Sequence, residues 1–410
     1  MSDAPFSVPH VDALSAAVQS EPDLGDLLTQ SLNKAKAAAQ KDLEPALYKA
    51  LDWPTDIPGY VDYLLKFWRW RPQQDPIPAW TKPGTNGFQE VYDRLCHFYF
   101  LVDQPVGPNG VRVQSIPAFA KFLVAYAKGW GSFLNTPDSF NDDILASFIK
   151  NSPEYAVGDS MIDGRPNAPS GWLTFNQFFA RELNPGLRPI HAPADNRVAV
   201  APADCTFKAT YAINENSEIP EIKLKGTHSF ASIGQLLDGG PYSDAFANGT
   251  FVHYFLGPYS YHRFHTPVAG RVVERRAIKG DVYLDVTLSE GQFDAPDTST
   301  DGYEFSQSRG LITLDTAGSP FGDVGVVAVL PIGMAQVSSV NMTAQLGADL
   351  MKGDEFGYFL FGGSDIIILF QEKAKPHLYL DASYRHYGTP MAILSGGCPC
   401  GPACKCGGGC

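Results

Sequence analysis

The sequence predicts an α+β protein with an N-terminal helical domain followed by a mainly antiparallel β core. Of its 410 residues, 44% are hydrophobic and 18% are charged, so the chain has enough apolar surface for a large buried core. Apolar residues recur at helical intervals as far as about Pro166. Beyond Asn184-Pro185-Gly186 they gather instead in short β-branched runs bounded by Gly, Pro, Asp or Asn, which is typical of strands.

Four segments of the N-terminal part carry the helical spacing. Their recurring apolar residues are Leu14, Val18, Leu24, Leu27, Leu28 and Leu32; Val61, Leu64, Leu65 and Trp68; Phe88, Val91, Tyr92, Leu95 and Tyr99; and Phe119, Phe122, Leu123 and Tyr126. Proline-rich stretches at 72–83 and 104–108 separate the segments and act as helix breakers. We therefore assign residues 1–165 to a helical domain.

The β part begins after one more predicted helix, over residues 174–183. Strands are expected at 198–200, 205–212, 250–255, 271–278, 282–288, 311–314, 324–330 and 366–371. We assign residues 166–394 to this core domain. The tail, residues 395–410, consists almost wholly of Gly, Pro and Cys and has no large aliphatic or aromatic residue with which to build a core.

Charge and hydropathy exclude several classes of function. The chain has 31 basic and 44 acidic residues, and its net charge of −13 argues against nucleic-acid binding and against charge-driven adhesion to anionic lipid. No window reaches the roughly 18 consecutive apolar residues of a membrane-spanning helix, so no transmembrane segment is predicted. The first basic residue is Lys34, which fits neither a secretory signal nor a transit peptide, and we expect a cytoplasmic protein.

The first candidate site is the run Gly362-Gly363-Ser364, which lies between two apolar segments. Two glycines before a serine allow a positive φ and an exposed, strained peptide bond. Attack of the Ser364 hydroxyl on the carbonyl carbon of Gly363 would shift the acyl group from nitrogen to oxygen. β-Elimination would then leave dehydroalanine, which hydrolyses to a pyruvoyl group. The alternative for this run is an ordinary hairpin turn.

The second candidate site combines His262 and His265 with Asp204. Histidine is the natural proton carrier near neutral pH, and residues three apart on an extended chain face opposite sides. The two histidines could instead be structural, or belong to a metal site with a third ligand. Asp204, in Ala201-Pro202-Ala203-Asp204, could orient an imidazole toward a serine hydroxyl or simply stabilise a turn.

Together these segments resemble the phosphatidylserine decarboxylase family of pyruvoyl-dependent enzymes. The resemblance covers roughly residues 171–371 and includes three more segments in the same order, at 175–190, 330–337 and 352–359. It implies that Ser364 is the precursor of the pyruvoyl group and that the chain is cut after Gly363, giving two chains from one precursor. It also implies that His265 and Asp204 complete a self-cleavage triad with Ser364, and that His262 handles protons during decarboxylation. The sequence departs from the family at Asp365, where Thr or Ser is usual.

The predicted substrate is a free aromatic L-amino acid, with tryptophan favoured. The acidic charge and the missing membrane segment fit a soluble substrate, and a helical domain before the core resembles the soluble fungal tryptophan decarboxylases. The alternative is a phosphatidylserine decarboxylase that makes phosphatidylethanolamine. A distant alternative is a non-enzymatic lipoyl or biotinyl carrier, suggested by residues 267–273 with Lys279-Gly280-Asp281, although the lysine lacks the usual Met-Lys pair.

The seven cysteines are distributed unevenly. Cys96 and Cys205 are isolated, and we expect them to be buried. The tail holds the other five, namely Cys398, Cys400, Cys404, Cys406 and Cys410. Their Cys-x-Cys spacing resembles that of metallothioneins and predicts binding of Cu(I) or Zn(II), the alternative being a flexible tail with reactive thiols.

Overall fold

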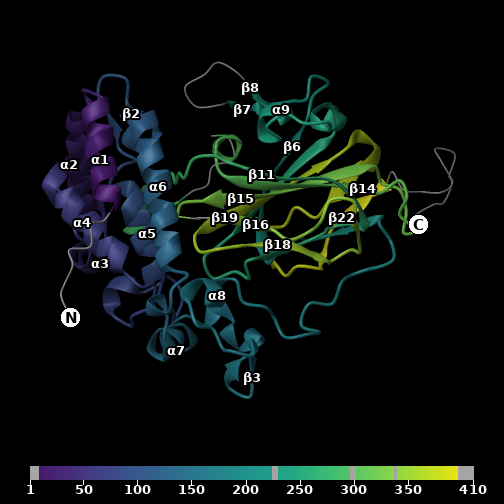
Figure 1. The fold of residues 1–410 in the computed structure, drawn as a ribbon, viewed down its shortest axis with the longest axis horizontal. Coiled ribbons are helices and arrows are strands. Elements are labelled where there is room, and N and C mark those ends of the chain that lie inside the picture. The colour runs from purple at the N-terminus through teal and green to yellow at the C-terminus, as the bar shows by residue number, and fades with distance from the viewer. Residues whose placement is uncertain (1–8, 224–229, 296–301, 337–338, 396–410) are drawn as a thin grey trace. The chain divides into compact units, whose positions relative to one another are not determined.

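The computed structural model describes residues 9–223, 230–295, 302–336 and 339–395 and confirms the α+β class (Figure 1). The chain forms two compact units. Of the described residues, the first unit comprises 9–179, 281–295 and 334–336, and the second comprises 180–223, 230–280, 302–333 and 339–395. Helices dominate the first unit and strands dominate the second.

The helices of the first unit are α1 (Pro9–Ser20), α2 (Leu24–Asp42), α3 (Pro45–Ala50), α4 (Ile57–Arg69), α5 (Glu90–Phe100), α6 (Pro117–Phe133), α7 (Asp142–Asn151) and α8 (Phe175–Phe179). The apolar spacing predicted α1, α2, α4, α5 and α6, whereas α3 and α7 lie outside its four segments. Asp56 and Asn141 cap α4 and α7, because their side chains accept a hydrogen bond from the backbone N–H three residues later. Three short hairpins complete the unit, β1 (Pro105–Val106) with β2 (Val111–Arg112), β3 (Met161–Ile162) with β4 (Arg165–Pro166), and β12 (Thr287–Ser289) with β13 (Gln292–Asp294).

Two predicted elements differ from the structure. Helix α8 ends at Phe179, whereas the prediction extended it to residue 183. The carbonyl of Ala180, which would accept a backbone hydrogen bond in a longer helix, accepts one from the guanidinium of Arg263 instead. The strand predicted at 282–288 is mostly irregular. Side chains from the helical unit bind its backbone instead of a strand ladder: Gln114 bonds both backbone groups of Leu284, and Asp103 accepts from the N–H of Val286.

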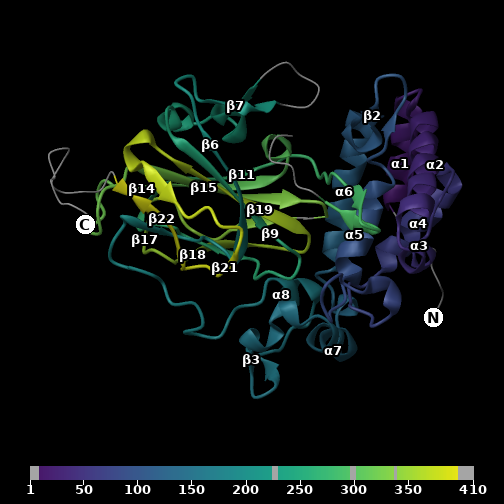
Figure 2. The ribbon, with the colours of Figure 1, turned by 180° about the vertical axis from the view of Figure 1, so that it is seen from behind.

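An eight-stranded sheet forms the centre of the second unit. Its order is β17 (Asp349–Leu350), β11 (Gly270–Ile278), β14 (Arg309–Asp315), β15 (Val326–Met334), β19 (Gly363–Phe370), β9 (Thr250–Leu256), β6 (Cys205–Ala212) and β21 (Tyr384–Arg385). Figure 2 shows β19, β9 and β6 side by side. Strand β19 pairs antiparallel with β9, in a register that places Ser364 opposite Leu256.

Three smaller sheets complete the second unit. They are β10 (Arg263–His265) with β18 (Glu355–Phe359) and β16 (Val340–Met342); β20 (Pro376–Leu378) with β22 (Pro390–Leu394) and β5 (Val198–Val200); and β7 (Glu218–Lys223) with β8 (Phe230–Ser232). The chain leaves β18 in one sheet and enters β19 in another. Gly362-Gly363-Ser364 lies at this crossing, so the run is not a hairpin turn.

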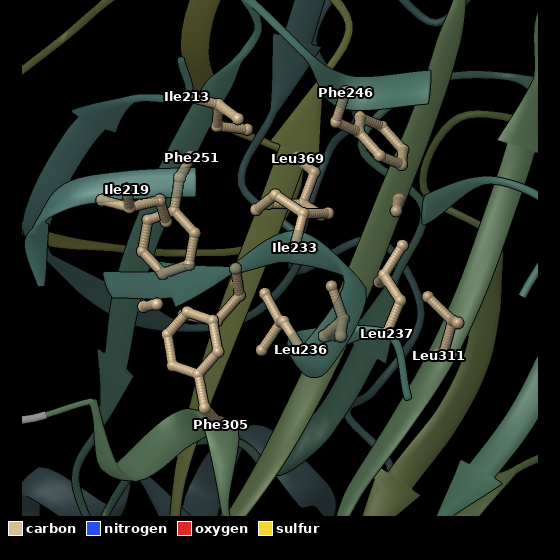
Figure 3. Close-up of a cluster of buried hydrophobic side chains, with 14 of the residues drawn as sticks. Ile213, Ile219, Ile233, Leu236, Leu237, Phe246, Phe251, Phe305, Leu311 and Leu369 are labelled. Atoms are coloured by element: carbon tan, nitrogen blue, oxygen red, sulfur yellow. The ribbon is translucent and has the colours of Figure 1, made fainter. Parts of the chain in front are cut away.

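One face of the large sheet carries a hydrophobic core (Figure 3). Phe251 of β9, Leu311 of β14 and Leu369 of β19 project into it, and the short helix α9 (Ile233–Leu236) covers them. Side chains alternate along a strand, so Ser364 lies on the opposite face of β19 from Ile367 and Leu369. The sheet thereby separates the apolar core from the candidate site.

Candidate active site

Ser364 is the second residue of β19 and is fully buried. The sequence suggested an exposed peptide bond at this position, whereas Ser364 is buried near the start of a central strand and does not lie on a surface turn. Gly362 has a φ of +151°, which favours glycine, so the predicted positive φ is present at the first of the two glycines. The Ser364 hydroxyl oxygen lies 3.3 Å from Nδ1 of His262.

His262 is held so that it can accept the Ser364 hydrogen. The turn from Gly257 to Ser260, closed by a 2.9 Å backbone hydrogen bond, brings the carbonyl of Pro258 to 3.3 Å from Nε2 of His262. A carbonyl only accepts, so Nε2 carries the hydrogen and Nδ1 presents its lone pair to the serine. Burial lowers the pKa of His262 to about 3, and the positive charge of Arg181 acts in the same direction. The imidazole is therefore neutral at physiological pH.

His265 is held between a carbonyl and two tyrosine rings. Its Nδ1 donates to the carbonyl of Gly353 at 2.9 Å, and its Nε2 accepts from the Tyr261 hydroxyl at 3.2 Å. The Tyr387 ring stacks on the imidazole with centroids 3.8 Å apart. Burial lowers the pKa of His265 to about 4, so this ring is neutral as well. Among the described residues, no hydrogen bond joins His265 to Ser364.

Asp204 is linked to His265 indirectly, because it binds the backbone of Tyr387, whose ring stacks on His265. Its carboxylate accepts from the backbone N–H of Tyr387 at 2.8 Å and forms a buried ion pair of 2.8 Å with Arg188. The segment that carries Asp204 is also fixed to β10, because the N–H of His265 donates to the carbonyl of Pro202 at 2.7 Å. The predicted aspartate therefore supports the residues around His265 and has no hydrogen bond with either imidazole in the described part of the chain.

Residues 352–355 contact the segment that carries His262 and His265. The ammonium of Lys352 is buried and donates to the carbonyls of Ala192, Asp195 and Val198 at 2.5–2.7 Å. This anchors the turn whose next residue, Gly353, binds His265. Glu355 then forms a 2.9 Å ion pair with Arg263, which lies between the two histidines.

Asp365 points to the other face of β19. Its Oδ2 accepts from the Tyr303 hydroxyl at 2.6 Å and lies 3.3 Å from Nε2 of His253, and all three side chains are buried. This cluster borders the hydrophobic core that contains Ile367, two residues further along the same face. Asp365 therefore does not contact the Ser364 side chain.

The structure thus forms two pairs from the four predicted residues: Ser364 with His262, and His265 with Asp204 through Tyr387. Sequence reasoning did not single out Tyr261, Arg188 or Gly353, although each lies in a segment that carries the family resemblance. Tyr387 lies beyond those segments and had no signal of its own.

The described residues fit the formation of a pyruvoyl group but contain no arrangement suited to a metal ion. A pyruvoyl group forms from a serine of the chain itself, and a buried serine next to a neutral imidazole and a Gly-Gly peptide fits that origin. Among the described residues, no group of three His, Cys, Asp or Glu side chains is arranged to hold a metal ion. The five tail cysteines lie outside the described residues. Cys96 and Cys205 are buried, as predicted.

Comparison with known proteins gives a family match over residues 175–385, slightly more than half of the chain, to the model described as phosphatidylserine decarboxylase. In the part of the chain that the structure describes, no helix is both long and apolar enough to cross a bilayer.

Three relatives show how the match is distributed. Phosphatidylserine decarboxylase proenzyme 2 of Oryza sativa subsp. japonica is 34% identical over 244 residues, which are 60% of this chain and 36% of the rice protein. Decarboxylase iboD of Amanita muscaria is 26% identical over 281 residues, 63% of this chain and 78% of the fungal protein. The phosphatidylserine decarboxylase proenzyme of Chlamydia trachomatis serovar L2 is 31% identical over 203 residues, 49% of this chain and 60% of the bacterial protein. The match thus spans only about a third of the rice relative.

Proposed function

Because this chain belongs to the phosphatidylserine decarboxylase family, we propose that it is a proenzyme that cuts itself between Gly363 and Ser364 and then acts as a pyruvoyl-dependent decarboxylase. The observation that carries this proposal is the contact between the Ser364 hydroxyl and the neutral imidazole of His262. A neutral imidazole that accepts a hydrogen bond from a serine is the usual means of activating that serine as a nucleophile.

Self-cleavage uses only groups of the chain and one water molecule. The Ser364 oxygen attacks the carbonyl carbon of Gly363 and passes its proton to His262. The bond between that carbon and the Ser364 nitrogen then breaks, the nitrogen takes the proton from His262, and an ester replaces the peptide bond. β-Elimination breaks the bond between Cβ of Ser364 and the ester oxygen, after loss of the Cα proton. Gly363 then ends the first chain as a carboxylate, and residue 364 begins the second as dehydroalanine. Water converts that end to a pyruvoyl group and releases ammonia.

His265 and Asp204 support this step without a hydrogen bond to Ser364 in the described part of the chain. The ion pair with Arg188 and the bond to the Tyr387 N–H fix Asp204, and Tyr387 stacks on His265. We propose that this arrangement promotes self-cleavage, the role that the family resemblance implies for His265 and Asp204.

In decarboxylation, the pyruvoyl group supplies an electron-accepting carbonyl for the loss of CO₂. His262 contacts residue 364 and is placed to hold or deliver a proton there. Ser364 and His262 are both fully buried, which keeps bulk water away from the reacting atoms.

The comparisons favour phosphatidylserine as the substrate over the free amino acid that the sequence predicted. The family model and two of the three relatives carry phosphatidylserine decarboxylase in their names. A free amino acid is the second candidate. It is favoured by the Amanita decarboxylase, whose name specifies no phospholipid and of which the match covers 78%.

The substrate assay compares the two candidates directly. The purified, cut protein is given phosphatidylserine in mixed micelles and, separately, free L-tryptophan and the other aromatic amino acids, and released CO₂ is measured. We expect turnover of phosphatidylserine to phosphatidylethanolamine, with the Ser364→Ala protein inactive as control. CO₂ from the free amino acids alone would assign the chain to the second candidate, and CO₂ from neither would contradict a decarboxylase of this class.

A further inference from the structure

The structure gives Asp365 three features that packing alone does not explain. It is fully buried, it lies on the face of β19 that otherwise meets an apolar core, and it directly follows the residue at which the chain is proposed to be cut. Burying a carboxylate opposes folding unless its oxygens are bonded. A β-branched apolar residue would fit this face at lower cost.

Two partners from different elements hold the carboxylate. Tyr303 donates to Oδ2 at 2.6 Å, and Nε2 of His253, on the neighbouring strand β9, lies 3.3 Å from the same oxygen. The other oxygen, Oδ1, has no hydrogen-bond partner among the described residues. The contacts therefore fix the position of Asp365 while leaving the carboxylate only half satisfied, which points to a role other than stability.

Alternation along the strand excludes direct participation in the chemistry. The Ser364 side chain reaches His262 on one face, and the Asp365 side chain reaches Tyr303 and His253 on the other. Asp365 can therefore act on residue 364 only through the backbone that joins them.

The backbone at residue 364 is held on both sides before the chain is cut and only on one side afterwards. Before the cut, β18 and the glycine crossing hold residue 364 from one side and β19 holds it from the other. After the cut, residue 364 is a chain end, and chain ends fray unless they are tied down. Asp365 is then the second residue of the new chain and the first whose side chain is bonded to the rest of the fold.

We propose that Asp365, held by Tyr303 and His253, is a positioning residue that anchors the new chain end, so that the pyruvoyl group formed from Ser364 stays beside His262. This inference rests on the proposed self-cleavage. It predicts that the anchor matters little in the uncut chain and becomes important only once the covalent link to Gly363 is gone.

The test introduces Asp365→Ala into two backgrounds, the cut enzyme and the uncut Ser364→Ala chain. Hydrogen exchange of the amides in β19 is followed in both. In the cut enzyme, kcat and KM are also measured per reactive carbonyl, which is counted by titration with a hydrazine. Asp365→Asn and Tyr303→Phe serve as milder variants, and Ile367→Val, on the same face, is the control for a general loss of packing.

The proposal predicts faster exchange at the start of β19 in cut Asp365→Ala but not in the uncut double variant. It also predicts a fall of about tenfold in kcat per carbonyl with KM unchanged, a smaller fall for the milder variants, and none for Ile367→Val. Equal loosening in both backgrounds, an unchanged kcat per carbonyl, or a failure of all three cluster variants to be cut would overturn it. A wild-type chain that is never cut would instead defeat the proposed function itself.

Discussion

At the scale of single residues, burial determines the protonation state of the two histidines that we propose take part in the chemistry. His262 and His265 are both buried, and desolvation lowers their pKa values to about 3 and about 4, where an unperturbed histidine would have a pKa near 6.5. Each ring also has its tautomer fixed by a backbone carbonyl, from Pro258 in one case and Gly353 in the other. Two histidines three positions apart in sequence thus have different partners and are proposed to have different tasks.

Separate alanine variants of the two histidines test this division of tasks. We expect His265→Ala to remain uncut, because the variant loses the group that links Gly353, Tyr261 and Tyr387. His262→Ala is expected to be cut slowly and, once cut, to turn over at least about 10²-fold more slowly, because it lacks the imidazole beside residue 364. Both quantities come from gel time courses and from CO₂ release per cut chain. Normal cutting of His265→Ala, or turnover of His262→Ala within about twofold of wild type, would contradict the assignment.

The lowered pKa values also predict the pH dependence of self-cleavage. A histidine with a lowered pKa keeps its neutral, proton-accepting form as the pH falls, down to about 4 for His265 and about 3 for His262. The cleavage rate should therefore stay nearly constant from about pH 8 to about pH 5, whereas a base with the ordinary pKa of about 6.5 would lose most of its activity in that range. Freshly translated precursor, shifted to each pH and sampled over time, gives the rate. A midpoint near pH 6.5 would show that the cleavage base is not buried as described.

At the scale of secondary-structure elements, the site depends on pairings that sequence does not reveal. The β-branched runs predicted β5 and β6 with their observed bounds and most of the other strands of the large sheet, but not the strands of the sheet that β10, β16 and β18 form. The hairpin turn that remained an alternative for the Gly-Gly-Ser run could not be excluded from sequence, because local composition cannot show that β18 and β19 belong to different sheets. The same limit explains the segment at 282–288, whose backbone is bonded by Gln114 and Asp103 from more than 150 residues away.

The buried ion pair of Asp204 with Arg188 gives a stability prediction for the elements around His265. In the uncut Ser364→Ala background, Asp204→Asn should lower the free energy of unfolding by about 3 kcal/mol, because it removes the negative charge from a buried ion pair with Arg188. The matched control is Asp195→Asn, which removes a half-exposed ion pair with Arg197 and should cost at most about 1 kcal/mol. Denaturant unfolding measures both. Equal losses of unfolding free energy in the two variants would show that the buried Asp204 ion pair stabilises the fold no more than the more exposed Asp195 pair does.

At the scale of the whole molecule, the sequence predicted the class of the fold and the family, while the structure supplied the geometry of the site. The change from helical to strand periodicity separates the two kinds of structure along the chain, and motifs in a fixed order carry the family resemblance. Tyr387 could not be predicted, because its role arises only where the Asp204 segment and β10 meet. Which substrate the enzyme takes likewise depends on a pocket that the motifs do not specify.

The cysteine-rich tail is predicted to be separate from catalysis. Removal of residues 397–410 should lower the copper or zinc bound per chain, because five of the seven cysteines lie there, and should leave decarboxylation within about twofold of the full chain. Metal analysis of the full and shortened proteins, with CO₂ release from both, tests the two parts together. A folded but inactive shortened enzyme would place the tail in the active site, and an unchanged metal content would remove its predicted metal-binding role.

The intact mass of the purified protein under denaturing conditions shows whether the chain cuts itself. We predict two chains, one of 363 residues that ends at Gly363 and one of 47 residues whose first residue is a pyruvoyl group in place of Ser364. Ser364→Ala should give a single inactive chain of about 44.6 kDa. Wild-type protein that decarboxylates its substrate while it remains a single uncut chain would show that the activity needs neither self-cleavage nor a pyruvoyl group.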